Sequence, residues 1–269
     1  MKKQAFIKYH GIGNDFILID NRRKDFQLSD KEIQLICDRH FGVGSDGLIL
    51  LERSFGVDFK MIFYNPDATK DMMCGNGGRC IVAFARHIGI VKIKYKFEAP
   101  DGIHTAEVFE KLRRNKLNIK LSLLDVDNIV EYTDGQFINS GTAHFVSFVN
   151  NLSELDINTL GSKIRHDKRF SDIMGTNANF VEIIAPGKLN IRTFERGVEG
   201  ETLACGTGIT ASAIAYVDRY NIQENPIIIN AKGGELKVYY TKTPDNRYTN
   251  IFLEGFAEKV FEGVFFFER

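Results

Sequence analysis

Residues 202–208 read TLACGTG, and residues 73–80 read MCGNGGRC. In each case a strand-like run leads to a loop with a Cys-Gly pair, and a helix of small residues follows. Cys74 and Cys205 are separated by nearly half of the 269-residue chain. A chain with 4 Cys and 24 Gly can repeat a Cys-Gly dipeptide by chance. The shared context of strand, Cys-Gly-x-Gly and helix is much harder to repeat by chance, and it indicates two related lobes.

Short strand-like runs alternate with helical stretches in both halves of the chain. Strands are expected at 6–9, 16–20, 47–51, 58–64, in a β block from 94 to 124, and at 137–139, 144–149, 179–185, 189–194, 227–230, 236–240, 250–252 and 260–267. Helices are expected after a capping box from Ser29 to Glu32, after residue 80, within 153–165 and after residue 208. The alternation predicts two α/β lobes that face each other, each with a cysteine at a helix N-terminus.

The composition narrows the classes of protein that the chain can be. It is 43% hydrophobic and 26% charged, which is too apolar for a disordered chain. Thirty-five basic and 35 acidic residues give no net charge, which argues against nucleic acid or an anionic membrane as the main partner. No apolar run approaches the roughly 18 residues of a transmembrane helix. The first ten residues also lack the apolar segment of a signal peptide, so we expect a cytoplasmic protein.

The four cysteines, at positions 37, 74, 80 and 205, form no CxxC pair and have no zinc-like spacing to a histidine. We therefore predict no metal site. Wide spacing in a chain of this size fits a reducing cytosol better than a disulfide framework.

A cysteine at a helix N-terminus is suited to acid–base chemistry. The helix dipole and the unpaired N–H groups favour the thiolate and lower the thiol pKa from about 8.5 toward neutrality. The same N–H groups can bind a carboxylate. Two such cysteines on opposite faces of an α-carbon could remove its proton from one side and deliver a proton to the other. No Walker motif, Rossmann unit or clear pyridoxal phosphate lysine is present, so we expect no cofactor.

Five segments, spread in order over nearly the whole chain, resemble the diaminopimelate epimerase family. They are YHGIGNDF at 9–16, FYNPDA at 63–68, MCGNGGRC at 73–80, GTNANF at 175–180 and FERGVEGETLACGTG at 194–208. The resemblance implies conversion of LL-diaminopimelate to the meso form, in lysine and peptidoglycan precursor synthesis, by a homodimer. It also implies an α+β fold of two pseudo-symmetric lobes, each a β-barrel-like sheet around a central helix. The lobes would span 1–125, joined by the last strand at about 258–269, and 126–257.

The resemblance also implies a role for each matching residue. Cys74 and Cys205 match the two catalytic cysteines. Substrate binding is implied for Asn14, Asn65, Gly75, Asn76, Thr142, Asn177, Glu195, Arg196, Gly206 and Thr207, and tuning of the thiols for His144 and Glu195. Arg196 is the natural partner of the distal carboxylate, because a guanidinium binds a carboxylate in a bidentate manner.

Three features depart from the family pattern. Thr142 stands where many members have Asn, Gly47 stands where some have a side-chain amide, and the 195–205 loop is one residue longer than the commonest form. Outside the pattern, Cys37 and Cys80 are expected to pack in the core, with a Cys74–Cys80 disulfide as the alternative for Cys80. Two other functions stay open: a racemase for another amino acid such as proline, and a non-catalytic amino-acid-binding protein.

Overall fold

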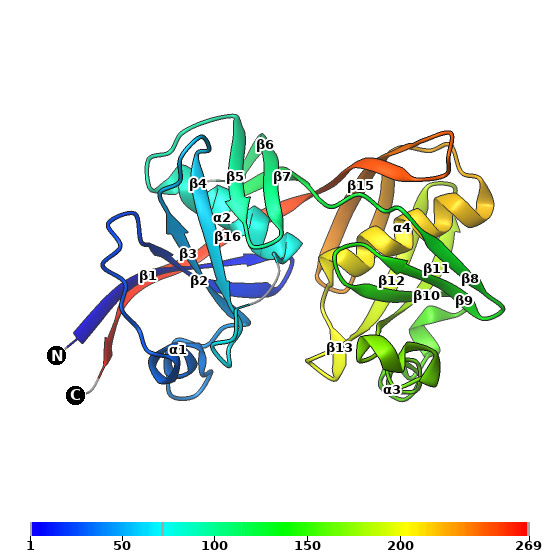
Figure 1. Cartoon of the computed structure of the whole chain (residues 1–269), viewed down its shortest axis with the longest axis horizontal. Helices are drawn as coiled ribbons and strands as arrows, with labels where there is room; N and C mark the ends of the chain where they lie inside the picture. Colours follow the sequence, from blue (N-terminus) through cyan, green and yellow to red (C-terminus); the bar gives the residue numbers. More distant parts are fainter. Residues whose placement is uncertain (1, 71–72, 114, 268–269) are drawn as a thin grey trace. The chain divides into compact units, whose positions relative to one another are not determined.

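The computed structural model of the chain describes residues 2–70, 73–113 and 115–267 (Figure 1). The ends of the predicted first lobe, Met1 and residues 268–269, lie outside this description. The chain forms two compact units, which we call unit 1 (Met1–Leu121 with Gly255–Arg269) and unit 2 (Ser122–Glu254). Both units combine strands and helices, as the α/β alternation predicts.

Unit 1 is a sheet that closes on itself. Its strands pair in the order β1-β2-β3-β4-β5-β6-β7-β16, and β16 pairs again with β1. The strands are β1 (Lys2–Gly11), β2 (Asn14–Asp20), β3 (Gly47–Glu52), β4 (Phe59–Tyr64), β5 (Lys94–Ala99), β6 (Gly102–Arg113), β7 (Lys116–Ser122) and the second part of β16 (Tyr248–Phe267).

The helix α2 (Gly75–His87) forms the centre of unit 1. Every residue from Gly75 to Ala85 is buried, and the helix packs on β1, β2 and β3. Two glycines allow this close packing on opposite sides. A Cβ on Gly77 would lie 3.1 Å from Ile49 of β3, and one on Gly78 would lie 2.6 Å from Leu121 of β7.

The other helix of unit 1, α1 (Asp30–Cys37), covers a separate part of the core. The predicted capping box is present: the Glu32 N–H donates to Ser29 Oγ at 3.4 Å, and the Ser29 N–H donates to Glu32 Oε2 at 2.7 Å. Cys37 packs in an apolar cluster with residues such as Ile33 and Leu48, which confirms its predicted core role.

Unit 2 repeats this plan. Its sheet has the order β8-β9-β10-β11-β12-β14-β15-β16, with β13 beside β12. Val126, before β8, exchanges backbone hydrogen bonds of 2.8 and 2.9 Å with Tyr248, at the start of β16. The strands are β8 (Ile129–Tyr132), β9 (Gly135–Asn139), β10 (Ala143–Phe148), β11 (Asn177–Ala185), β12 (Lys188–Glu195), β13 (Gly200–Thr202), β14 (Ile227–Ala231), β15 (Gly234–Lys242) and the first part of β16.

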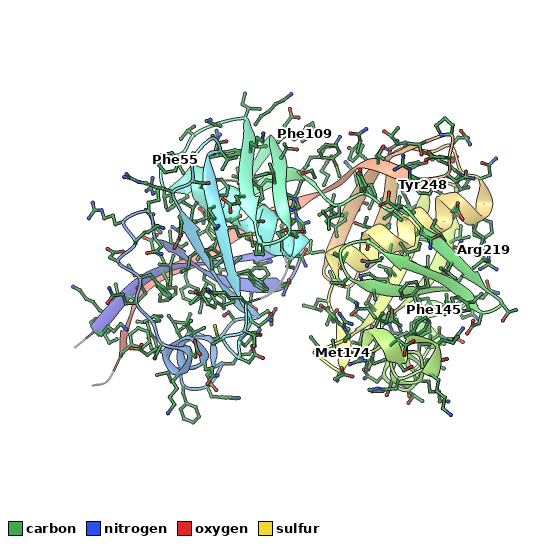
Figure 2. The ribbon with its side chains drawn as sticks, in the orientation of Figure 1. Phe55, Phe109, Phe145, Met174, Arg219 and Tyr248 are labelled. Atoms are coloured by element: carbon green, nitrogen blue, oxygen red, sulfur yellow. The ribbon has the colours of Figure 1, made fainter. Side chains whose placement is uncertain are left out.

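The helix α4 (Gly206–Tyr220) is the central helix of unit 2. It packs on strands from β9 to β15, and Gly206 and the residues from Gly208 to Val217 are buried. Outside the sheet lie α3 (Ile157–Arg165) and the short 3₁₀ helices η1 (Leu152–Glu154) and η2 (Lys168–Ile173). Phe145 of β10, labelled in Figure 2, packs against Phe170 of η2 with ring centroids 5.5 Å apart.

The last strand differs from its prediction. The sequence pattern predicts two strands, at 250–252 and 260–267, whereas β16 is continuous from Tyr248 to Phe267. The intervening residues look loop-like because they include a glycine and several charges. Glu254 is nevertheless buried, and Tyr239 donates a hydrogen bond of 2.7 Å to its carboxylate. Pairing with β15 and then with β7 and β1 supplies the hydrogen bonds that the local sequence does not reveal.

Among the described residues, no helix combines the length and apolar character needed to cross a membrane.

Gly47, one of the departures from the family pattern, lies where β3 begins and faces β4. A Cβ at this position would lie 2.6 Å from Phe63 Cε2 and 2.9 Å from the Tyr64 carbonyl oxygen. The Phe63 ring therefore fills the space that a larger residue would need.

We expect Gly47→Ala to lower the free energy of unfolding by about 1–3 kcal/mol, because the extra methyl group overpacks the core. Gly200→Ala is the matched control, since the nearest atom to its added Cβ would be Asn158 Oδ1 at 4.0 Å. Urea denaturation followed by far-UV circular dichroism measures both. Equal stability of the two variants would contradict the packing argument.

Candidate active site

Cys74 is the N-cap of α2. It is half-buried, its backbone is extended (φ −87°, ψ 130°), and its side chain makes no capping hydrogen bond. Its carbonyl accepts the first helical bond from the Gly78 N–H at 2.7 Å. The N–H groups of the first helical turn have no carbonyl of their own helix to bond. They therefore favour negative charge beside the sulfur.

Hydrogen bonds bring together three of the predicted site residues in unit 1. The Cys74 thiol donates to Asn14 Oδ1 at 3.5 Å, and Asn76 Nδ2 donates to the same oxygen at 3.2 Å. Asn14 Nδ2 donates to Asp46 Oδ2 at 2.7 Å, so the Asn14 oxygen is held toward the sulfur. Gly75 lies between Cys74 and Asn76 in the sequence and begins α2.

Asp46, which is not among the residues predicted from the sequence, is anchored by an ionic network. Arg39 lies 2.6 Å from Asp46 and 2.8 Å from Asp15, and Lys8 lies 2.7 Å from Asp15. Burial alone would raise the pKa of Asp15, but hydrogen bonds from Arg39 and Lys8 outweigh it and lower this pKa to about 2. Asp15 is therefore ionised at neutral pH, and the network that orients Asn14 is intact. No local pattern marks it, because its members come from four separate segments.

Asn65 follows β4 and is bonded within its own loop. Its Nδ2 donates to Thr69 Oγ1 at 3.1 Å, and its backbone N–H donates to the Thr69 carbonyl at 2.8 Å. Its predicted role in substrate binding stays a prediction.

Cys205 has the same position in unit 2, as the N-cap of α4. Its backbone is extended (φ −110°, ψ 114°), and its side chain makes no capping hydrogen bond. Its carbonyl accepts from the Ile209 N–H at 2.9 Å. Only 7% of the residue is exposed, and its sulfur lies 3.4 Å from Thr207 Oγ1.

His144 lies behind Thr207, and its tautomer is fixed by Asn179. The Thr193 hydroxyl donates to Asn179 Oδ1 at 3.0 Å, so Asn179 Nδ2 donates to His144 Nδ1 at 3.1 Å. The ring proton is therefore on Nε2. This nitrogen lies 2.9 Å from the hydroxyl oxygens of both Thr142 and Thr207.

The His144 ring is neutral at physiological pH. Burial, and to a smaller extent the charge of Arg196, lowers its pKa to about 3. It acts as a hydrogen-bond donor toward the two threonine hydroxyls, which lie 3.1 Å from each other. The Thr207 hydroxyl can then donate to the Cys205 sulfur, which favours the thiolate. The structure thus brings together the predicted residues Thr142, His144, Cys205 and Thr207.

Asn177 and Arg196 form a second group in unit 2. Asn177 Nδ2 donates to the Ala143 carbonyl, and its Oδ1 accepts from the Arg196 backbone N–H, both at 2.8 Å. The Arg196 guanidinium donates through Nη1 to the carbonyls of Ile173 and Gly175, at 3.0 and 3.1 Å. Within the described part of the chain it has no carboxylate partner.

Glu195 ends β12, where its backbone pairs with Gly200 of β13. Its predicted roles, in substrate binding and in tuning the thiols, stay predictions.

Asn179 and Thr193 are not among the site residues predicted from the sequence. One signal did exist, in the second glycine of the Cys-Gly-x-Gly motif. A Cβ on Gly208 would lie 2.4 Å from Asn179 Oδ1 and 3.2 Å from the His144 ring. This glycine therefore leaves room for the His144–Asn179 pair beneath the start of α4.

None of the four cysteines forms a disulfide, and Cys80, like Cys37, is buried. This confirms the packing role of Cys80 over the alternative disulfide with Cys74. Within the ranges that the structure describes, no three His, Cys, Asp or Glu side chains gather in a way that could hold a metal ion.

Each unit therefore provides a thiol at the start of a buried helix, surrounded by hydrogen-bonding side chains that can stabilise it with or without its proton. Such a group is suited to taking a proton from carbon, or giving one, next to a carboxylate bound by the helix N–H groups.

Known proteins match nearly the whole chain. The family model described as diaminopimelate epimerase matches residues 6–119 and 136–260. The chain is 47% identical to a diaminopimelate epimerase of Flavobacterium psychrophilum, over 95% of this chain and 97% of the relative. It is 43% identical to that of Chlorobaculum tepidum (94% and 98%) and 39% identical to that of Aquifex aeolicus (96% of each).

Solved structures share the fold at low identity. A phenazine biosynthesis protein of the PhzF family from Bacillus anthracis superimposes with a TM-score of 0.77 at 16% identity, over 99% of this chain and 100% of that one. A hydroxyproline epimerase from Agrobacterium vitis gives 0.70 at 13% identity, over 98% and 91%. These likenesses confirm the predicted α+β architecture with β-barrel sheets.

We expect Thr207→Val to raise the pKa of the Cys205 thiol by about 1 unit, because a hydrogen bond to a charged group is worth about 1.5 kcal/mol. The rate of Cys205 alkylation by iodoacetamide against pH, in a Cys74→Ser background, reports this pKa. Thr207→Ser keeps the hydroxyl and is the control. An unchanged profile in Thr207→Val would show that the hydroxyl does not act on the sulfur.

Proposed function

Because the chain belongs to the diaminopimelate epimerase family, its activity is the epimerisation of diaminopimelate in lysine biosynthesis, and we propose that Cys74 and Cys205 carry out this isomerase reaction. The observation that supports the proposal most directly is that both cysteines are N-caps of buried helices without a side-chain capping bond. In both units a cysteine therefore stands at the N-cap, where Ser, Thr, Asp or Asn is usually found.

In the proposed reaction one sulfur, as a thiolate, removes the α-proton of LL-diaminopimelate. The other sulfur, as a thiol, delivers its proton to the opposite face of the same carbon, which gives the meso isomer. One C–H bond breaks and another forms, and no electrons are gained or lost. The two cysteines end with exchanged protonation states, so each serves as acid in one direction and as base in the other.

Backbone N–H groups of Gly75, Asn76, Gly206 and Thr207 are proposed to bind the reacting α-carboxylate. They belong to the first turns of α2 and α4, where N–H groups lack helical partners. The same groups would stabilise the negative charge that moves onto the carboxylate as the proton leaves.

The remaining predicted residues would bind the rest of the substrate. For Arg196, support comes from its guanidinium, which is held by two carbonyls and lacks a carboxylate partner among the described residues. A distal carboxylate can fill that place with a bidentate contact. Asn14, Asn65, Thr142, Asn177 and Glu195 are proposed to bind other polar groups of the substrate.

Incubation of the reduced protein with LL-diaminopimelate in D₂O, without added cofactor, tests the proposal by proton NMR. We expect loss of the α-proton signal together with formation of the meso isomer. Cys74→Ala and Cys205→Ala should each lower the rate by at least about 10³-fold, because each removes a proton-transfer group. Cys37→Ala replaces a core thiol and should retain activity.

The alternatives are separated by the same assay. L-lysine lacks the distal carboxylate and should exchange its α-proton at least about 100-fold more slowly than diaminopimelate, since Arg196 loses its partner. Exchange of proline with no exchange of diaminopimelate would favour the other racemase. Binding of diaminopimelate with no exchange would favour the non-catalytic binding protein.

We also propose that the chain forms a homodimer. Support comes from the outer face of β16, where Val260, Val264 and Phe266 are each about half exposed. Exposed apolar side chains that cluster on one strand are typical of an interface. Sedimentation equilibrium should give a dimer mass at micromolar concentration, and Val264→Asp should weaken it. A monomer mass for the unmodified protein would contradict the proposal.

A cytoplasmic location is proposed as well. It is supported by the four cysteines, which form no disulfide and so fit a reducing compartment. Fractionation of source cells tests it, and recovery with an extracellular or membrane fraction would contradict it.

A further inference from the structure

Arg79 is a fully buried charge on the helix that Cys74 begins. It lies five residues after Cys74, and none of its surface is exposed. Its Nη2 donates to Asn76 Oδ1 at 2.5 Å, whereas Nε and Nη1 have no hydrogen-bond partner among the described residues. Gly11 of β1 closes over this pair: a Cβ there would lie 3.4 Å from Nη2 and 3.3 Å from Asn76.

An unpaired guanidinium in this place is costly, because a buried charge loses its hydration. Burial lowers the pKa of Arg79 to about 10, an effect that the nearby thiols of Cys80 and Cys74 partly oppose. Because this value is well above neutral pH, the side chain remains a cation. A buried cation that has no ion-pair partner among the described residues favours the ionised form of a neighbouring acidic group.

Cys74 is the neighbour that can take up this charge. Cys80 is completely buried, and burial raises the pKa of its thiol far above the ordinary range. Burial likewise raises the pKa of Tyr9 on β1. Among the described residues, Asp15, whose charge acts on Cys80, is already paired with Lys8 and Arg39, and Arg39 also binds Asp46.

Unit 2 has no such cation at the matching place. Five residues after Cys205 stands Thr210, which is buried and donates its hydroxyl to the Gly206 carbonyl at 3.0 Å. The side chain behind Cys205 is instead the neutral His144. The two thiols therefore differ in their electrostatic surroundings although their helix positions match.

We propose that Arg79 is a positioning residue that favours the Cys74 thiolate and holds Asn76 in place, so that the resting negative charge lies on Cys74 rather than on Cys205. Arg79 donates to Asn76 Oδ1, and Asn76 and Cys74 both donate to Asn14 Oδ1, so hydrogen bonds connect the cation to the group around the thiol. The part that Arg79 plays in turnover rests on the proposed function, whereas its effect on the Cys74 thiol can be measured without any turnover.

The test measures alkylation of Cys74 by iodoacetamide against pH, in a Cys205→Ser background, with the modified peptide identified by mass spectrometry. We expect Arg79→Met to raise the pKa of Cys74 by about 1 unit, so that its thiolate fraction at pH 7 falls about tenfold. Arg79→Gln also removes the charge but keeps an N–H donor for Asn76, and it should give a similar shift. Arg79→Lys keeps the charge and should restore the low pKa.

Two controls separate this effect from a general loss of structure. Thr210→Val alters the matching position of unit 2 and should leave the Cys74 profile unchanged. With Arg79 unchanged, Cys74 in the Cys205→Ser protein should react with iodoacetamide at lower pH than Cys205 does in the Cys74→Ser protein.

An unchanged Cys74 profile in folded Arg79→Met or Arg79→Gln would overturn the proposal. If neither neutral variant folds, Arg79→Lys still decides, because a raised Cys74 pKa with the charge retained would also overturn it. If the neutral Arg79 variants do not raise the Cys74 pKa but the unmodified protein epimerises diaminopimelate, only the role of Arg79 is contradicted. If these variants raise the Cys74 pKa but the unmodified protein does not epimerise diaminopimelate, only the proposed function is contradicted.

Discussion

The first turn of a buried helix presents N–H groups that need a partner from outside the helix, and a cysteine stands at this point in both units. A Ser or Asp cap would bind one of these groups and stabilise the helix by about 1 kcal/mol. Cys74 and Cys205 form no such bond, so the N–H groups remain available to an anion. The closed sheets keep both helices buried, which strengthens the field at their ends because screening by water is reduced.

The two sulfurs share this backbone position but differ in what surrounds them. Cys74 is linked through Asn14 and Asn76 to a buried cation, whereas Cys205 contacts a hydroxyl backed by a neutral histidine. A full charge acts over a longer range than a hydroxyl dipole and is less sensitive to geometry. The internal repeat therefore preserves the helix starts while the side chains around them diverge, which is suited to a substrate carbon with two different faces.

Local patterns were sufficient for much of this structure. The capping box at Ser29, the Cys-Gly loops and most of the strands follow from residues close in sequence, and the family resemblance supplied the site residues. Two kinds of feature could not be predicted. The pairing of Asn179 with His144 depends on neighbouring strands, and the continuity of β16 depends on partners from both halves of the chain. Arg79 also gave no signal, because a single arginine in a helix is usually exposed.

A sulfur that acts as both acid and base must not be stabilised too strongly in either form. Around Cys74 this balance comes from opposed contacts: Asn14 Oδ1, held in place by Asp46, accepts a hydrogen bond from the thiol, while the helix start and Arg79 favour the anion. Around Cys205 one group can serve both forms, because the Thr207 hydroxyl can accept from a thiol or donate to a thiolate by rotation. Beside Cys74 the Asn14 oxygen can only accept a hydrogen bond, so a cation is needed to stabilise the thiolate. Beside Cys205 the Thr207 hydroxyl can rotate and donate, so no cation is needed there. This difference accounts for a buried arginine in unit 1 and for a threonine at the matching place in unit 2.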